Sequence, residues 1–497
     1  MGKSTNQIDE QNETKASPEA NIGQAKKPAG KKRGLIIAGA VVLVLALGTG
    51  AYAFMSRDRG EQKDTGQTPK ESSVTSNADE NGLVSSMDLE CVPRGHDNYR
   101  TNNTLAVDPS NTNIVYVGVE YKGVYKSTDG GETWKQSDKG IRGYAMQSDK
   151  TKKCIQELGR TIIDSKDPKH LLVSRVESPG DLSTKFSENA GVWESHDSGA
   201  SWKQIVQKGM NASGSRAIAF DPKDSNIIYY GINNGTPSFT DANGQKMDKL
   251  YNKEGILYQT NDGGKVWREL PTGADKGLRA LNVGVDSSDS KKLWLFSFSE
   301  SAQGGTESGD KQKAVLTSTD GGKSWTSLAD KLPPGYRTLA GGALSPKNGQ
   351  IAFVTTQTRQ GSPKSFTTSN GGASWSESNM YIEAADFDPN DSTGKRLLGY
   401  APYGSTPSIV ESRDGGKTWT QLSKVPAEVD GQENGVRISG FAFSQSDKNV
   451  VYMSGSSGYV WKSTDNGKTW KVVMDLDKIG GANKNAQGST KSSEQDH

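Results

Sequence analysis

Short apolar segments alternate with polar turns through most of the chain, and the same succession of segments returns seven times. Each unit opens with an apolar stretch that runs through a polar turn into a second apolar stretch, as in residues 105–118 and 218–231. Apolar and β-branched residues favour strands, and Asp-Pro followed by Ser, Asn or Lys favours a turn. A third strand, such as GVYKS at 123–127, and a short fourth strand near a Trp complete each unit.

A polar box separates the third strand from the fourth. It has the form Ser/Thr-x-Asp-x-Gly-x-x-Trp, first occurs as STDGGETW at 127–134, and recurs every 44 to 68 residues. Its acidic position is held by Asp129, Asp197, Asp262, Asp320, Asn370, Asp414 and Asp465, and its aromatic position by Trp134, Trp202, Trp267, Trp325, Trp375, Trp419 and Trp470. A side-chain oxygen here accepts bonds from the turn's own N–H groups, Gly supplies a positive φ, and the Trp ring packs beneath. We therefore expect structural roles for these residues; Asn370 keeps the acceptor and loses the charge.

Seven units of four strands predict an all-β fold, a seven-bladed β-propeller over residues 87–477. Stacked repeats share one continuous core, so a length of 497 residues does not imply several globular domains.

The boxes resemble the Asp-box (BNR) repeats of sialidases, the sortilin lumenal domain, xyloglucanase-type glycoside hydrolases and photosystem II assembly factor-like proteins. The resemblance covers roughly residues 99–474. It implies that the boxes lie on the face opposite the ligand site, which agrees with structural roles for their aspartates. These families differ in activity, so the motif is specific for the fold and does not select a function.

The first 86 residues differ from the repeats. Residues 1–33 form a basic leader with seven Lys/Arg against four Asp/Glu, 34–55 are apolar and uncharged, and 56–86 form a polar, flexible linker. The apolar run is long enough for a transmembrane helix, and basic residues before a span favour the cytoplasmic side. We expect a single-pass membrane protein with its propeller outside the cytoplasm. The alternative is a signal peptide cleaved near Ala53, which exports the same domain. The tail, 478–497, is polar and is expected to be disordered.

Composition and motif content argue against several classes of ligand. The net charge of +2 gives no basic field for nucleic acid, and no nucleotide, cofactor or zinc fingerprint occurs. His96, His170, His196 and His497 show no metal-ligand spacing, so we expect no metal and no cofactor. Cys91 and Cys154 lie in the part expected outside the cytoplasm, where an even pair favours a disulfide over two thiols.

Arginines recur at or just ahead of the innermost strand in six of the seven units: Arg100, Arg160, Arg216, Arg279, Arg337 and Arg437. Innermost strands line a propeller's channel, so these guanidiniums are candidates for a ring that binds carboxylate, phosphate or sulfate. The alternative is that each one pairs with a neighbouring carboxylate or caps carbonyls between blades. The sixth unit carries Glu383 instead. The loops between second and third strands are long in the second, third and fourth units, as expected of a binding surface.

An enzymatic reading has one candidate catalytic residue. Glu120 occupies the place where xyloglucanase-type enzymes carry a catalytic Asp, but glycoside hydrolysis uses two carboxylates and no partner is evident. Sialidases carry an Arg-Ile-Pro motif that this chain lacks; Val92-Pro93-Arg94 does not replace it.

The sequence thus favours a binding or scaffold module for an anionic glycan, peptide or protein partner. A glycoside hydrolase of the xyloglucanase or sialidase type, acting on extracellular polysaccharide, is the alternative. A further alternative, an assembly factor for a membrane complex, rests on the resemblance to the photosystem family alone.

Overall fold

The computed structural model describes residues 104–476, with gaps at 120–121, 142–143, 146–152, 155–157, 176–190, 207–213, 233–255, 274–277, 300–314, 358–361, 404–405, 427–436 and 456–457. The predicted leader, transmembrane helix, linker and tail lie outside these ranges and stay predictions. Within the described ranges, no helix is both long and apolar enough to cross a membrane.

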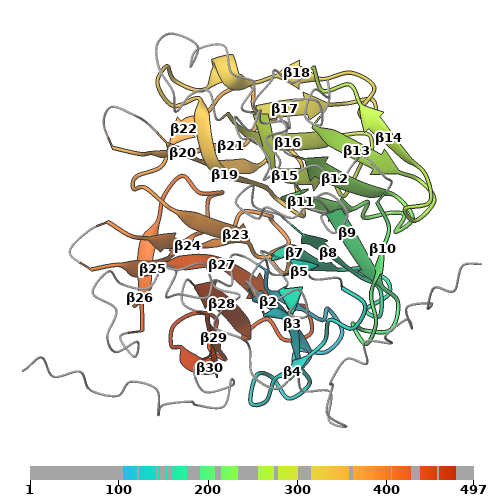
Figure 1. Cartoon of the computed structure of the whole chain (residues 1–497). Coiled ribbons are helices and arrows are strands. Elements are labelled where there is room, and N and C mark those ends of the chain that lie inside the picture. Colours follow the sequence, from blue (N-terminus) through green and yellow to red (C-terminus); the bar gives the residue numbers. More distant parts are fainter. Residues whose placement is uncertain are drawn as a thin grey trace, which may run out of the picture. The chain divides into compact units, whose positions relative to one another are not determined.

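The described chain forms seven four-stranded antiparallel sheets, which confirms the predicted propeller (Figure 1). Blade 1 is β1 (Ala106–Val107), β2 (Val115–Val119), β3 (Gly123–Ser127) and β4 (Lys135–Gln136); blade 2 is β7 (Leu158–Ile163), β8 (Leu171–Arg175), β9 (Gly191–Ser195) and β10 (Lys203–Gln204); blade 3 is β11 (Gly214–Phe220), β12 (Ile228–Ile232), β13 (Leu257–Thr260) and β14 (Trp267–Leu270). Blade 4 is β15 (Leu278–Val285), β16 (Leu293–Ser299), β17 (Val315–Ser318) and β18 (Thr326–Ser327).

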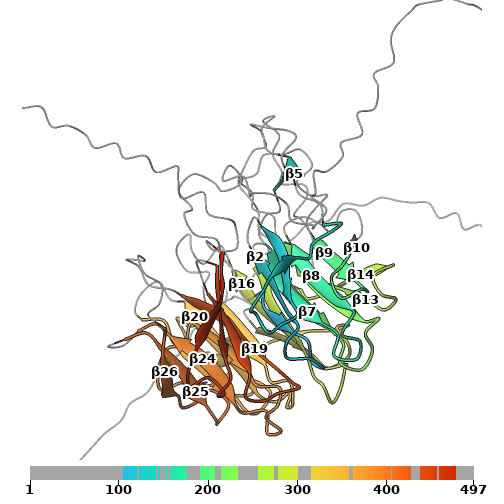
Figure 2. The same ribbon diagram turned by 90° about the horizontal axis from the view of Figure 1, so that it is seen from below.

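The remaining blades follow the same order of strands. Blade 5 is β19 (Thr338–Leu344), β20 (Ala352–Gln357), β21 (Ser365–Thr368) and β22 (Ser376–Glu377); blade 6 is β23 (Ala384–Phe387), β24 (Leu397–Ala401), β25 (Ser408–Ser412) and β26 (Thr420–Lys424); blade 7 is β27 (Ile438–Phe443), β28 (Val451–Gly455), β29 (Tyr459–Ser463) and β30 (Lys471–Asp475). A small hairpin, β5 (Tyr144–Ala145) with β6 (Lys153–Cys154), lies between blades 1 and 2 in sequence and to one side of the sheets in Figure 2. A 3₁₀ turn, η5 (Ala329–Lys331), follows blade 4.

The blades close into a ring. The first strand of each blade contacts the first strand of the next, and β1 of blade 1 also contacts β27 of blade 7 (Figure 1). Polar side chains join the innermost strands of different blades: Arg160 Nη1 of β7 donates to Asn282 Oδ1 of β15 at 3.0 Å, and Asp386 of β23 accepts the Phe441 N–H of β27 at 2.8 Å. Arg160 also interacts electrostatically with Asp386.

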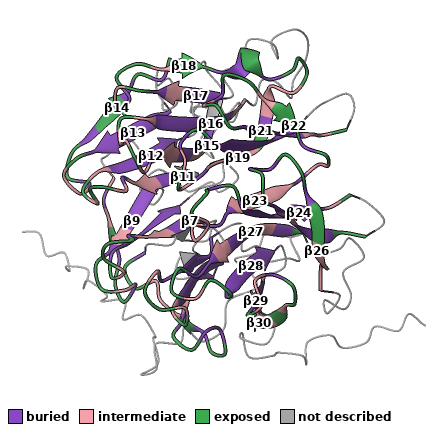
Figure 3. Cartoon of the chain, turned by 180° about the vertical axis from the view of Figure 1, so that it is seen from behind, coloured by how far each residue is buried: buried purple, intermediate pink, exposed green. Residues whose placement is uncertain are grey.

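The core consists of apolar wedges between neighbouring blades. Val117 and Val119 of blade 1 pack with Tyr452 and Met474 of blade 7, and corresponding clusters fill the other junctions between blades. Middle strands are buried throughout, as in β2 and β8, whereas the short outer strand β18 is exposed (Figure 3). Burial on both faces of the middle strands explains their continuous apolar runs in the sequence.

The boxes lie on the turn between the third and fourth strands. In blade 1, Ser127 Oγ donates to Asp129 Oδ1 (2.8 Å) and accepts the Gly131 N–H (2.8 Å), while Asp129 accepts the Thr133 N–H (2.9 Å). Trp134 Nε1 donates to the Gly131 carbonyl (3.0 Å) and to the Val473 carbonyl of blade 7 (2.8 Å). The box therefore closes its own turn and also joins two blades.

Each box also contacts the turn between the first and second strands, as when Gly130 N–H donates to the Asn113 carbonyl at 2.9 Å. Both kinds of turn therefore share one face of the propeller, which we call the box face. The turns between second and third strands, together with the connections between blades, occupy the opposite face, which we call the loop face.

Candidate functional site on the loop face

Three chain segments of blades 6 and 7 meet on the loop face. Tyr381 and Glu383 directly precede β23, Tyr403 follows β24, and Arg437 directly precedes β27. Antiparallel topology brings the start of a first strand and the end of a second strand to the same face, because paired strands run in opposite directions.

Charged and aromatic groups are in contact there. Arg437 Nη1 lies 3.2 Å from Glu383 Oε1, and the Tyr381 and Tyr403 rings have centroids 5.5 Å apart at an interplanar angle of 30°. Tyr403 is 65% exposed, the largest exposure of any large apolar or aromatic side chain in the described part of the chain. The cluster therefore offers a solvent-facing aromatic surface beside a carboxylate and a guanidinium.

Burial sets the protonation behaviour of this cluster. Burial raises the pKa of Glu383, and the nearby Arg437 only partly opposes the shift. Burial, followed by the charge of Glu383, raises the pKa of Tyr381 to about 12, so this phenol stays neutral and keeps a proton to donate. A half-buried carboxyl group with a raised pKa is suited to proton transfer, because it holds a proton at a pH where an ordinary Glu has lost it.

A second carboxylate with a raised pKa lies at the loop-face end of blade 1. Burial raises the pKa of Asp138 to about 6, against a hydrogen bond from Gln136. Gln136 Nε2 donates both to Asp138 Oδ2 (2.7 Å) and to the Lys122 carbonyl (3.2 Å), which ties Asp138 to the turn that follows β2. The predicted catalytic residue Glu120 belongs to that turn and itself lies outside the described residues.

The structure places three of the six predicted ligand-binding arginines completely. Arg160 donates to Asn282, Arg437 pairs with Glu383, and Arg337 Nη1 lies 3.5 Å from Asp330 Oδ1. Arg216 and Arg279 lie in β11 and β15, with no description of their side chains, and Arg100 is outside the described residues. Arg437 and Arg337 thus contact a carboxylate and Arg160 an amide oxygen, and the anion-binding ring stays a prediction.

The predicted disulfide is not described either, since Cys91 lies outside the described ranges and only the backbone of Cys154 is placed, in β6. The sequence pattern singles out Glu383 only as the residue that replaces the recurring arginine in the sixth unit. It misses the tyrosine pair, because Tyr381 and Tyr403 belong to different segments and no sequence period relates them.

Comparison with known proteins agrees with the fold. The BNR/Asp-box repeat model matches residues 125–136, and the model "Sortilin, neurotensin receptor 3" matches residues 190–334. A probable oligoxyloglucan-reducing end-specific xyloglucanase of Neosartorya fischeri is 25% identical over 328 residues, which cover 65% of this chain and 34% of that protein. A xyloglucanase of Hypocrea jecorina is 29% identical over 175 residues, covering 32% of this chain and 20% of the relative. The chain thus spans about a third or less of the length of these two relatives.

Solved structures show the same architecture. The GH74 enzyme of Niastella koreensis superimposes with a TM-score of 0.54 at 15% identity, covering 76% of this chain and 54% of the enzyme. The GH74 xyloglucanase of Xanthomonas campestris superimposes with a TM-score of 0.53, also at 15% identity, over 76% of this chain and 55% of the enzyme. Fold and boxes together define a seven-bladed propeller built from Asp-box repeats. This architecture agrees with the BNR/Asp-box repeat match, and the chain is similar to Asp-box propeller proteins.

Proposed function

We propose that this protein is a glycoside hydrolase that acts on a neutral polysaccharide of the xyloglucan class, bound across the loop face. The observation that carries the proposal is Glu383, a half-buried carboxyl group of raised pKa beside an aromatic pair. The similarity to xyloglucanases supports the substrate class. With the predicted membrane anchor at residues 34–55, the enzyme would work on polysaccharide outside the cytoplasm.

Each group in the cluster has a role in this proposal. The exposed ring of Tyr403 stacks against the apolar face of a sugar ring, and Tyr381 supports it from the side. Glu383 protonates the glycosidic oxygen as the C–O bond breaks, and Arg437 orients the Glu383 carboxylate. Water adds its hydroxyl group to the anomeric carbon and returns a proton to the enzyme, so atoms and charge balance.

Hydrolysis requires a second carboxylate that activates the water or attacks the anomeric carbon. Blade 1 offers two candidates for this role: Asp138, and Glu120 in the sequence just before Lys122, whose carbonyl shares the Gln136 amide with Asp138. Both residues are therefore tested separately.

The test measures reducing ends released from xyloglucan, mixed-linkage glucan and an anionic glycan by the full chain in detergent. Glu383→Gln is expected to lower the rate on xyloglucan by about 10²- to 10⁴-fold, the usual contribution of an acid–base group. Tyr403→Ala is expected to raise KM roughly tenfold with a smaller change in kcat, because stacking contributes about 1 kcal/mol or more to binding. Glu377→Gln, on the exposed outer strand β22, is the matched control and should leave the rate unchanged.

Asp138→Asn and Glu120→Gln identify the second carboxylate, since only the catalytic one should abolish product while sparing xyloglucan binding. The proposal is wrong if the wild-type chain releases no product from any glucan, or if Glu383→Gln and Glu377→Gln behave alike.

A second candidate function is non-catalytic binding of an anionic glycan, peptide or protein. It is favoured by Arg437, which is 70% exposed on the loop face although it contacts Glu383. Salt-sensitive binding of the anionic glycan, lost in Arg437→Ala and without product from any substrate, would select this function.

A further inference from the structure

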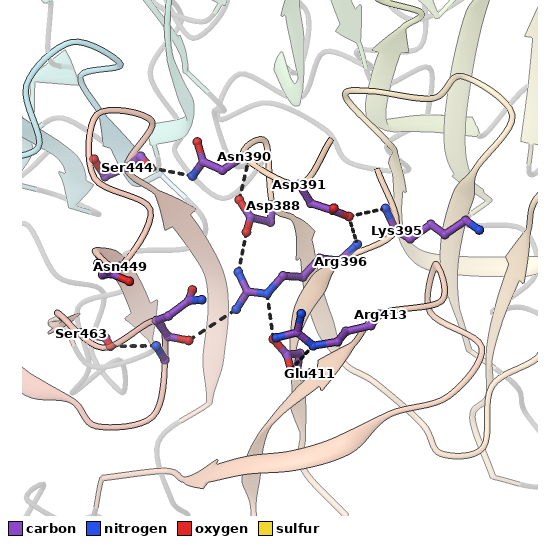
Figure 4. A network of polar contacts seen from close by, with 12 residues as sticks. Asp388, Asn390, Asp391, Lys395, Arg396, Glu411, Arg413, Ser444, Asn449 and Ser463 are labelled. Atoms are coloured by element: carbon purple, nitrogen blue, oxygen red, sulfur yellow. Dashed lines mark hydrogen bonds and ion pairs between the residues drawn. The ribbon is translucent and has the colours of Figure 1, made fainter. Parts of the chain in front are cut away.

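Blades 2 and 6 carry the same pair of carboxylates, with histidines in blade 2 at the positions where blade 6 has arginines. In blade 6, Arg396 lies between Asp388 and Glu411, with its Nε 2.7 Å from Glu411 Oε1, and Arg413 Nε lies 2.9 Å from Glu411 Oε2 (Figure 4). Both carboxylates are thereby neutralised by guanidinium groups.

Blade 2 repeats the two carboxylates at the same register positions. Leu172 of β8 pairs with Glu194, as Leu398 of β24 pairs with Glu411. The Asp164 N–H donates to the His170 carbonyl, and the Asp388 N–H donates to the Arg396 carbonyl in the same way. The correspondence is therefore Asp164 for Asp388, His170 for Arg396, Glu194 for Glu411 and His196 for Arg413. Both blades also place a phenylalanine ring beside the central residue: His170 packs edge-on against Phe220, and Arg396 lies over Phe443. Phe220 and Phe443 are each the last residue of the first strand of the following blade.

The imidazoles and carboxylates of blade 2 converge. His170 Nε2 lies 2.9 Å from Glu194 Oε1, His196 Nε2 lies 3.3 Å from Glu194 Oε2, and one such atom from each of the three residues falls within 4.8 Å of the others. The two imidazole rings are stacked with centroids 4.3 Å apart. Ligands of a tetrahedral zinc ion at about 2.0–2.1 Å lie roughly 3.3 Å from one another, so these distances approach those of a zinc site, and the stacked rings must turn for both lone pairs to reach one ion.

The tautomer of His170 decides whether its Nε2 atom can bind a metal ion. His170 Nδ1 lies 3.4 Å from Asp164 Oδ2, so a neutral ring that donates from Nδ1 turns the Nε2 lone pair toward the Glu194 oxygen. The other neutral tautomer donates from Nε2 to Glu194, so a metal ion that binds here takes the place of that proton. One metal ion in this position would bind both neutral imidazoles and the Glu194 carboxylate.

The site is enclosed on one side and open on the other. His170 and Glu194 are 8% and 10% exposed, and they border a cavity of about 700 Å³ between blades 2 and 3 on the box face. Asp262 and Asn226 of blade 3 line the same cavity, and His196 is 65% exposed at its edge. Arg396 reaches across to the Asn466 carbonyl of the next blade, whereas the shorter His170 ends at this cavity.

We propose that His170, Glu194 and His196 bind one divalent transition-metal ion. Asp164 would fix the orientation of the His170 ring, and the fourth coordination position would face the cavity, open to a water molecule. Two imidazoles and one carboxylate favour zinc over calcium or magnesium, which prefer oxygen ligands. A carboxylate behind a ligating histidine fixes its tautomer and strengthens the metal bond. This site lies on the box face, so it is independent of the loop-face glycan site.

The test titrates the full chain, prepared without a polyhistidine tag, with Zn²⁺ in a calorimeter and with Co²⁺ in a spectrophotometer. The wild-type chain is expected to bind one equivalent at pH 7.5 and to give the intense visible bands of tetrahedral Co²⁺. Binding should weaken below about pH 6, because protons compete for the imidazoles. His196→Ala, at the most exposed ligand, should weaken binding at least tenfold, and the matched control His497→Ala should not.

A variant that keeps the fold separates metal binding from structure. His170→Arg combined with His196→Arg reproduces the residues of blade 6 and is expected to fold with an unchanged circular dichroism spectrum while losing the metal. The proposal is overturned if the wild-type chain binds no zinc, or if this double variant binds it as the wild-type chain does. Unchanged binding in His196→Ala would equally overturn it.

Discussion

At the scale of single residues, the box aspartates are held ionised by hydrogen bonds. The hydroxyl and then the N–H of Thr133, followed by the Ser127 hydroxyl, lower the pKa of Asp129 to about 2. Asn370 of the fifth box keeps the same geometry without the charge: it accepts the Ser374 N–H at 3.0 Å and donates to Ser374 Oγ at 2.8 Å. The turn therefore needs the acceptor oxygen, and the negative charge of Asp129 makes the stability of the folded chain depend on pH.

This dependence gives a prediction for Asp129→Asn, which copies the fifth box. The pKa of Asp129 is lower in the folded chain than its ordinary value near 3.9, so its stabilisation is complete above about pH 4 and is lost as the pH falls toward 2. The difference in melting temperature between wild type and variant should be constant from pH 7 to 5 and shrink between pH 4 and 2. Differential scanning calorimetry across this range measures it, and an offset independent of pH would contradict the account.

At the scale of elements, Arg396 holds the first turn of blade 6 to its third strand and to blade 7 (Figure 4). Arg396→Leu leaves the buried Asp388 carboxylate without its counter-charge, while Glu411 keeps only the exposed Arg413. Loss of one partner of a buried pair costs about 3–5 kcal/mol, so the urea midpoint should fall markedly. Arg413→Leu is the matched control: Arg413 contacts the same Glu411 but is 71% exposed, and its loss should cost about 0–1 kcal/mol. Equal effects of the two substitutions would show that burial does not decide the strength of this network.

The strands were predictable from the sequence because each blade repeats one local code. Asp-Pro turns such as Asp108-Pro109, apolar runs such as 115–119 and the box signals all depend on neighbours in the chain, and each forms as predicted. The loop-face cluster was not predictable, because Tyr381, Tyr403 and Arg437 meet only after blades 6 and 7 pack together. The spacing of His170 and His196 predicts no metal site for a similar reason: strands β8 and β9 separate the two residues in sequence, and only the pairing of these strands brings the rings together.

At the scale of the whole molecule, the ring is stable only if blade 1 fits against blade 7. Gly131 of the first box has a φ of 97°, and a Cβ atom there would lie 2.8 Å from Val473 Cβ of blade 7. Gly321 of the fourth box has a φ of 75° and open space around its Cα. Both glycines thus have a positive φ, but only Gly131 lies in close contact with the neighbouring blade.

Alanine at these positions separates the two effects. Gly321→Ala should cost about 1–2 kcal/mol, the strain of a left-handed alanine. Gly131→Ala should cost about 1–3 kcal/mol more, because the methyl group overpacks the closure between blades. Urea unfolding followed by tryptophan fluorescence measures both, and equal losses would mean that the junction of blades 1 and 7 has room to relax.

The measurement that tests the central claim most directly is the pH dependence of product release from xyloglucan by the full chain and by Glu383→Gln. Glu383 acts as an acid, so the wild-type rate should fall as the pH rises through the raised pKa of this residue. The variant should be at least about a hundredfold slower below that pH and should lack this descending limb. Absence of product at every pH, or a descending limb that Glu383→Gln retains, would contradict the assignment of the loop face as a hydrolytic site.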